Sequence, residues 1–373
     1  MKSSKHHALL PLLGILLLSL LLAEALLRLR TWLMPESTVR NFEAFLSPAF
    51  MRVWPDGSVR YEPNAQVRIA TVINDQVVFD QRYASNDFGL FDSWDYGATS
   101  WPEPRIALAG DSYTAGQGSP AWFPAFREQL AAGLEPISVF NLGLSGAGVM
   151  QVGDLTLALN PKLDFQKVVI PVICDDFRRR RWAPMRDVER WHLCLRSRYD
   201  AGQCDPPDRS FGIIVPNSTP ASALPGWLSK AGNAATNVAQ DLPWYRHAFH
   251  ALRQRSRLVN LANNVRTAPA ARRALQDLEQ DNLRALVELG QRFGNSNVHV
   301  LWFAPDPPDA GTFEHCDSLR ERTAKLPIVH ADLRAACNVT RQDQHPIDLH
   351  LNPDGYLKLQ TCLTSYLRKM SLK

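Results

Sequence analysis

The sequence predicts an α/β fold in which helices cover both faces of a parallel β-sheet. Short apolar runs recur through the second part of the chain, and helical stretches separate several of them. The strands of a parallel sheet form such continuous runs because helices bury both of their faces. Polar and glycine-rich motifs directly follow three of these runs, at the strand ends where functional groups collect in such folds.

The predicted strands begin at Arg105, Ile137, Lys167 and Val298, and a weaker fifth run spans 327–330. The predicted helices span 122–134, 270–293 and 354–369. Pro171 lies inside the third run and has no N–H for a β-ladder. It predicts that this strand lies at an edge of the sheet or carries a bulge.

The first thirty residues predict a membrane anchor. Residues 8–29 are predominantly apolar and have about the length of a membrane-spanning helix. Glu24 interrupts this stretch near one end, and the long side chains of Arg28 and Arg30 can reach the membrane interface. A cleaved signal peptide needs small residues at its cleavage site, and the sequence around Glu24 fits that requirement poorly. An uncleaved anchor is therefore favoured.

The cysteines bear on the side of the membrane. Six are present, none with the spacing of a metal site. Cys194 and Cys204 lie ten residues apart in a loop-like stretch and can form a disulfide in an oxidising compartment. Cys174 ends an apolar run, so we expect it to be a buried thiol. Basic residues flank both ends of the anchor, so its charges orient it weakly. The cysteines and the motifs below favour a catalytic domain outside the cytoplasm. The alternative for the cysteines is that all six are reduced.

Three regions follow from these patterns: an anchor at 1–30, an accessory and partly β segment at 31–104, and a main domain at 105–373. The main domain contains a proline-rich stretch at about 204–265 in which the apolar periodicity fades. This stretch predicts an insertion that is either a lid or a passive excursion. The net charge of +4, from 41 basic and 37 acidic residues, is too small to indicate a nucleic-acid partner.

Three motifs follow the first three strands. Ser112 ends the sequence Gly-Asp-Ser after the first strand, a composition also common in ordinary turns. Gly146 lies in a glycine-rich turn after the second strand, and its N–H can approach an oxyanion closely. Asp175 and Asp176 follow the third strand, where an aspartate could also cap a helix.

A fourth motif, Asp348-Leu-His-Leu-Asn-Pro, precedes the last predicted helix. His350 can act as a general base toward Ser112, and Asp348 can hold its tautomer and stabilise its charged form. A lone histidine beside an aspartate is usually structural. The four motifs together, each next to the expected element, favour catalysis.

These motifs resemble those of the SGNH/GDSL hydrolase family. The resemblance covers about 83–369 and the anchor, but not the insertion, and it includes the segment 85–91, which resembles a stretch of membrane-anchored members. It implies a three-layer α/β/α sandwich with a parallel sheet of about five strands, and ester hydrolysis or acyl transfer. It also implies that Ser112 is the nucleophile and first oxyanion donor, that Gly146 is the second donor, and that His350 and Asp348 complete the triad.

One position departs from the family pattern. The family usually has an asparagine where this chain has Asp175, and an ionised carboxylate only accepts hydrogen bonds. Either burial and Asp176 keep Asp175 protonated, or a nearby arginine compensates its charge, or activity is altered or lost. The following arginines, 178–181, form either a solvated face or a clamp for an anionic group. Asp111, Asp176, Arg178 and Arg179 are therefore candidate substrate-binding residues.

We expect an O-acyl esterase or acyltransferase in the bacterial inner membrane, with a single span and a periplasmic catalytic domain. Its expected substrate is an acylated cell-envelope carbohydrate or another ester, and no metal or organic cofactor is implied. One alternative is an inactive relative that binds glycan or takes part in assembly. The other is a lipase-like enzyme that acts on membrane lipid.

Overall fold

The computed structural model describes residues 15, 18–26, 29, 42–97, 100–132, 137–228, 257–304, 310–346 and 348–371. The chain forms two compact units, one of Met1–Arg40 with Leu228–Leu275, and a larger one of Asn41–Trp227 with Gln276–Lys373. Much of the expected anchor lies outside the described residues. Within the described ranges, no helix is both long enough and apolar enough to cross a membrane.

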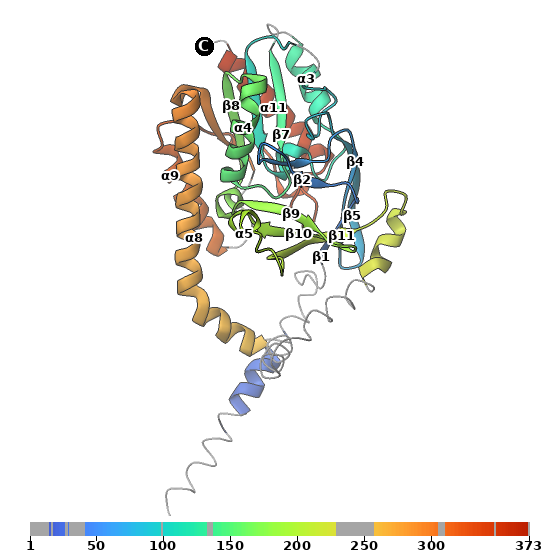
Figure 1. Cartoon of the computed structure of the whole chain (residues 1–373). Coiled ribbons are helices and arrows are strands. Elements are labelled where there is room, and N and C mark those ends of the chain that lie inside the picture. Colours follow the sequence, from blue (N-terminus) through green and yellow to red (C-terminus); the bar gives the residue numbers. More distant parts are fainter. Residues whose placement is uncertain are drawn as a thin grey trace, which may run out of the picture. The chain divides into compact units, whose positions relative to one another are not determined.

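The five predicted strands form one parallel sheet in the larger unit, which confirms the predicted α/β fold. The strands are β6 (Arg105–Gly110), β7 (Ser138–Gly143), β8 (Lys167–Val172), β12 (Val298–Trp302) and β13 (Val329–Asp332). Their order is β13-β12-β8-β6-β7, and all neighbours run parallel (Figure 1). Strand β6 pairs with both β7 and β8, so the loops that follow these three strands meet at one edge of the sheet.

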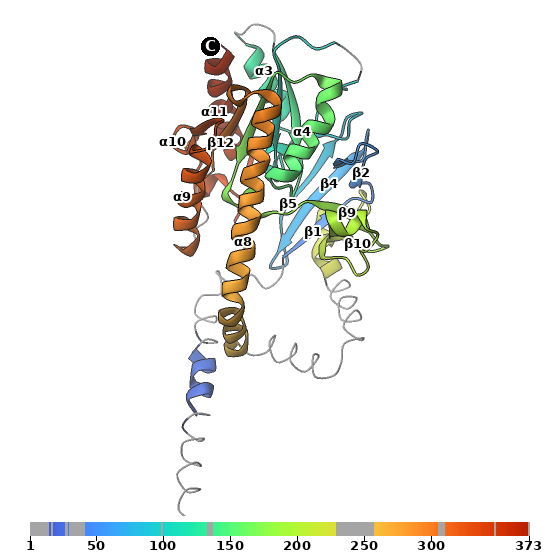
Figure 2. The same ribbon diagram turned by 60° about the vertical axis from the view of Figure 1, so that its left-hand side comes forward.

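Helices cover both faces of this sheet. On one face, alternate strand residues such as Ala107 and Val300 share a core with α4 (Val149–Leu163) and the end of α8 (Arg257–Phe293). On the other face, Leu108 and Leu301 share a core with α3 (Phe123–Ala131) and α11 (Pro353–Ser371). The alternation follows from the two-residue period of a strand. The result is three layers, and Figure 2 shows α4 and α8 together beside the sheet.

Pro171 does not place its strand at an edge, so that expectation is wrong. Strand β8 lies inside the sheet, between β12 and β6. Its register with β6 runs only from Lys167 to Val169, whereas its register with β12 continues through Pro171 to Val172. The missing N–H of the proline therefore lies beyond the ladder with β6.

A second, six-stranded sheet joins two distant parts of the chain. Its order is β5-β4-β1-β11-β10-β9. Strands β1 (Phe42–Leu46), β4 (Gln66–Ile73) and β5 (Gln76–Ala84) come from the expected accessory segment. Strands β9 (Trp182–Arg186), β10 (Arg190–Leu195) and β11 (Arg209–Ile214) come from the main domain, and β11 lies within the expected insertion. Because β1 pairs in parallel with β11, these segments share one sheet, and Figure 1 labels the two strands.

A small hairpin, β2 (Met51–Val53) and β3 (Val59–Tyr61), follows β1. Its buried side chains, including Tyr61, belong to the same apolar core as one face of the parallel sheet. The N-terminal strands therefore pack directly on the layer that carries the catalytic motifs.

All six cysteines are paired. The pair Cys194–Cys204 is the one that the sequence suggested. Cys174 is buried, but it is bonded to Cys316 and is not the free thiol that we expected. Its partner lies on α9 (Ala310–Ala324), 142 residues away in sequence, so no local pattern reveals it. The third disulfide joins α10 (Arg334–Cys337) to α11 through Cys362.

Candidate active site

Ser112 stands at the exit of β6, on the short helix α2 (Ser112–Ala115). Asp111 caps this helix, because its Oδ1 accepts a hydrogen bond from the N–H of Tyr113 at 2.9 Å. Gly110 allows the turn to be tight: a Cβ there would lie 2.1 Å from the Thr114 hydroxyl oxygen. The turn presents the Ser112 side chain to a cavity of about 950 Å³, a volume typical of ligand sites.

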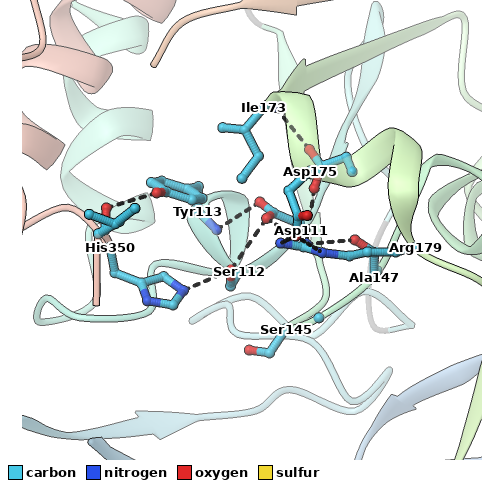
Figure 3. Close-up of polar contacts among 12 residues, drawn as sticks. Asp111, Ser112, Tyr113, Ser145, Ala147, Ile173, Asp175, Arg179 and His350 are labelled. Atoms are coloured by element: carbon cyan, nitrogen blue, oxygen red, sulfur yellow. Dashed lines mark hydrogen bonds and ion pairs between the residues drawn. The ribbon is translucent and has the colours of Figure 1, made fainter. Parts of the chain in front are cut away.

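The His350 ring faces Ser112 across this cavity. The distance from His350 Nε2 to Ser112 Oγ is 2.9 Å (Figure 3). His350 Nδ1 is hydrogen-bonded to Asp348 Oδ1 on the far side of the ring. Burial alone would raise the pKa of Asp348, but the charge and hydrogen bonds of His350 outweigh it and hold this pKa below its ordinary value. Asp348 is therefore an ionised partner that can orient the imidazole.

The loop that carries His350 is fixed to the nucleophile turn. Leu349 has a φ of +70°, and its carbonyl oxygen accepts a hydrogen bond from the Tyr113 hydroxyl at 2.7 Å. His345 Nε2 lies 2.6 Å from the carbonyl oxygen of Gly118. Phe79 of the second sheet packs its ring 5.3 Å from that of His345 and 6.1 Å from that of His350. Both sheets therefore hold the histidine in place.

Gly146 follows β7 and lines the same cavity as Ser112. Its φ of +76° suits glycine. Trp182 Nε1 donates to the Gly146 carbonyl oxygen at 3.1 Å, and the Tyr61 hydroxyl accepts from the N–H of Ser145 at 2.9 Å. Among the described residues, the N–H groups of Ser112 and Gly146 have no hydrogen-bond acceptor. They are thus available as donors to an oxyanion.

Asp175 lines the cavity from the 3-10 turn η2 (Cys174–Arg178), and its side chain is 60% exposed. Its Oδ2 lies 2.9 Å from both Nε and Nη2 of Arg179. An arginine therefore compensates its charge, which is one of the three possibilities that the sequence left open. Asp175 is not buried, whereas the neighbouring Asp176 is, because its side chain is only 5% exposed.

Arg179 connects the loops that follow three strands. Its Nη1 lies 2.9 Å from Asp111 Oδ2, 2.9 Å from Asp176 Oδ1 and 3.0 Å from the carbonyl oxygen of Ala147 (Figure 3). Burial and the nearby Asp111 raise the pKa of Asp176 well above its ordinary value. Burial would lower the pKa of Arg179, but the three carboxylates outweigh it and raise this pKa. Asp111, Asp176 and Arg179 thus form a network beneath the cavity.

The run of four arginines does not act as one clamp. Arg178 lies 3.5 Å from the buried Glu279, and Arg181 lies 2.6 Å from Asp154. Arg179 forms ion pairs with Asp111, Asp175 and Asp176. Of the run, Arg180 alone is exposed at the cavity and forms no ion pair in the described part of the chain, although its charge contributes to lowering the pKa of Asp208, which also lines the cavity. Arg209 and Arg341 line the cavity in the same way.

Sequence reasoning missed several residues that shape the site. The Tyr83 hydroxyl lies 3.0 Å from the carbonyl oxygens of Gly116 and Ser119, and Tyr61 holds the Gly146 turn. Both tyrosines come from strands far from the motifs. Tyr83 lies in the segment 31–104, for which the sequence predicted some β-structure but no contact with the motifs. No group of side chains suited to hold a metal occurs among the residues that the structure describes.

No family model and no curated protein matches the chain. Solved structures similar to it include a lipase/acylhydrolase from Enterococcus faecalis (16% identity, TM-score 0.35, 71% of this chain and 95% of that one). A putative acylhydrolase from Bacteroides fragilis has 13% identity and a TM-score of 0.34, over 74% of this chain and 92% of that one. A GDSL-like lipase from Bacteroides thetaiotaomicron has 12% identity and a TM-score of 0.33, over 74% and 94%. Likenesses of this extent establish no function for the chain.

Proposed function

We propose that the chain is a serine hydrolase or acyltransferase that acts on ester-linked acyl groups. The observation that carries this proposal is the hydrogen-bonded series Ser112–His350–Asp348, which opens on a cavity beside the N–H groups of Ser112 and Gly146. A serine, an oriented imidazole and two oxyanion donors are the parts that acyl transfer requires.

In the proposed reaction, Ser112 Oγ attacks the carbonyl carbon of the ester while His350 Nε2 takes the hydroxyl proton. The carbonyl oxygen becomes an oxyanion that accepts hydrogen bonds from the N–H groups of Ser112 and Gly146. The C–O bond of the ester then breaks, and the leaving alkoxide receives the proton from His350. Water, or the hydroxyl of an acceptor, attacks the acyl-serine with His350 as its base and restores the enzyme.

Asp175 is compatible with this chemistry because Arg179, which it shares with Asp111 and Asp176, offsets part of its charge. A free carboxylate at the cavity would oppose the developing oxyanion. Nε and Nη2 of Arg179 both lie 2.9 Å from Asp175 Oδ2. This contact weakens the repulsion between the Asp175 carboxylate and the developing oxyanion. The intact triad and this compensation weigh against the inactive alternative.

For the alcohol part of the ester we propose a cell-envelope carbohydrate that carries an anionic group. The support is the set of three arginines without carboxylate partners among the described residues, namely Arg180, Arg209 and Arg341. Guanidinium groups suit carboxylate and phosphate. Three disulfides favour an oxidising compartment. This supports our proposal that the catalytic domain lies in the periplasm and that the segment 1–30 anchors it to the inner membrane.

The test is turnover of p-nitrophenyl acetate by the full chain and by Ser112→Ala. We expect the variant to lose about a thousandfold or more in kcat, because it lacks the nucleophile. Ser93→Ala, an exposed serine away from the cavity, is the matched control and should turn over like the wild type. Undiminished turnover by a folded Ser112→Ala protein would overturn the proposal.

A further inference from the structure

One face of the second sheet lines the cavity. On β1, Phe42, Ala44 and Leu46 line it, whereas the alternate residues Glu43 and Phe45 do not. This is the two-residue period of a strand with one face toward an open space. Nothing in the proposed reaction uses these residues.

The neighbouring strands continue this surface. On β4, Ile69 is the partner of Leu46 and Thr71 is the partner of Ala44, and both line the cavity. Cross-strand partners of this kind have adjoining side chains on one face of a sheet. From β10 and β11, Leu193 and Phe211 add two half-buried apolar side chains. We call this surface the apolar floor: Ala44, Leu46, Phe50, Ile69, Thr71, Leu193 and Phe211.

The apolar floor begins at the oxyanion glycine. A Cβ on Gly146 would lie 3.5 Å from the ring of Phe211, which places this ring beside the position where a carbonyl oxygen would bind. The ring of Phe211 lies 5.7 Å from that of Phe50. Apolar contacts therefore run without a break from the reaction centre onto the sheet.

Charged groups border the apolar floor, and one of them, Arg209, is the cross-strand partner of Leu193. The arginines without carboxylate partners among the described residues come from the loop after η2, from the first residue of β11 and from the turn η6 (Arg341–Asp343). The cavity thus combines an apolar sheet face with bordering charged side chains, and Ser112 lines the same cavity. An ester bound at Ser112 has two substituents, and apolar surface selects the acyl chain over a polyhydroxy alcohol.

We infer that the apolar floor binds the acyl chain of the substrate, and that the protein prefers esters of medium-chain acids to acetyl esters. This inference rests on the proposed function and adds the class of acyl group to it. The carbonyl carbon lies at Ser112, the first methylenes pass Phe211, and the rest of the chain lies along Ala44 and its neighbours. Each methylene buried there can raise kcat/KM by up to about fourfold.

The test compares p-nitrophenyl acetate, butyrate and octanoate as substrates of the full chain. We expect kcat/KM to rise by at least about tenfold from acetate to octanoate. In Ala44→Phe a ring fills the middle of the apolar floor, so octanoate should lose at least about tenfold while acetate stays within about twofold. The matched control is Ala84→Phe, the same change at an exposed position of the same sheet outside the cavity, which should leave both rates unchanged.

Equal kcat/KM for the three esters, or an equal loss of acetate and octanoate turnover in a folded Ala44→Phe protein, would overturn the inference. Absence of turnover of all three esters by the wild type would contradict the proposed function instead. If Ala44→Phe does not fold, calorimetric binding of butyrate, octanoate and decanoate to Ser112→Ala decides. Affinity that rises with chain length supports the apolar floor, and affinity independent of chain length refutes it.

Discussion

Arg179 donates a hydrogen bond to Asp111 at 2.9 Å, although the two residues lie 68 positions apart in sequence. Asp111 caps the helix that begins with Ser112, so this contact joins the turn after β8 to the proposed nucleophile. The same nitrogen of Arg179 lies 3.0 Å from the carbonyl oxygen of Ala147, next to the oxyanion glycine. One guanidinium therefore fixes the loops after β6, β7 and β8 relative to one another.

Replacement of Arg179 by lysine should lower kcat for p-nitrophenyl acetate by about tenfold or more. An ammonium group cannot reproduce the planar fork, and it leaves the buried Asp111 without one of its hydrogen-bond donors. The matched control is Arg181→Lys, whose partner Asp154 is half exposed and whose ion pair contributes about 1 kcal/mol or less. Equal kcat for the two variants, measured well below their unfolding temperatures, would argue against a positioning role for Arg179.

The sequence predicted the parallel sheet and the triad because both leave local patterns. Buried parallel strands are apolar runs, Ser112 directly follows one of them, and His350 lies just before the last helix. The origin of the second sheet was not predictable. Phe45 of β1 pairs with Ile213 of β11, and no local pattern records a partner so distant. A register shift between Trp191 and His192 also breaks the alternation that would mark β10 as a strand.

The Arg179 network escaped prediction for a similar reason. Four consecutive arginines suggest a single cationic surface, but successive side chains point in different directions. Arg178 and Arg181 reach Glu279 and Asp154 on separate helices, α8 and α4, whereas Arg179 turns inward. The contacts of such a run depend on the packed neighbours and not on its own spacing.

Asp175→Asn should retain or raise ester turnover. The asparagine Oδ1 can still accept from Arg179, and its Nδ2 can donate toward the oxyanion as the family's amide does. Asp175→Ala provides no donor, so we expect its kcat to be about tenfold below that of Asp175→Asn. Turnover of p-nitrophenyl acetate by both variants, with circular dichroism to confirm folding, checks this. If the folded asparagine variant is inactive, the carboxylate itself is required.

Asp176 should make the folded state less stable as pH rises above about 4. Burial and Asp111 raise its pKa in the folded state, whereas the unfolded carboxyl titrates near its ordinary value of 3.8. Between the two values the folded state holds more protons than the unfolded state, so the free energy of unfolding falls with rising pH. This contribution is complete below the unfolded pKa and is lost as pH rises through the folded pKa.

The variant Asp176→Asn cannot titrate, so its free energy of unfolding should depend less steeply on pH across this window. Urea unfolding of both proteins between about pH 4 and 8 measures the difference, in which the titrating groups that do not interact with Asp176 cancel. If the wild-type value increased with pH relative to that of the variant, Asp176 would be an ionised partner of Arg179 in the folded protein.

The disulfide Cys174–Cys316 should matter for both stability and turnover. It closes a segment of 142 residues, whereas Cys337–Cys362 closes one of 25 residues. In the chain-entropy model, the double serine variant of the first pair should lose about 1.5 kcal/mol more of its free energy of unfolding than that of the second.

Cys174 also lines the cavity and begins η2, the turn that carries Asp175 and precedes Arg179. Removal of the disulfide lets this turn shift relative to Ser112. We therefore expect Cys174→Ser/Cys316→Ser to lower kcat for p-nitrophenyl acetate at 25 °C, and Cys337→Ser/Cys362→Ser, away from the cavity, to lower only the unfolding temperature. If both double variants retained full kcat while folded, the position of η2 would depend on Arg179 and packing alone.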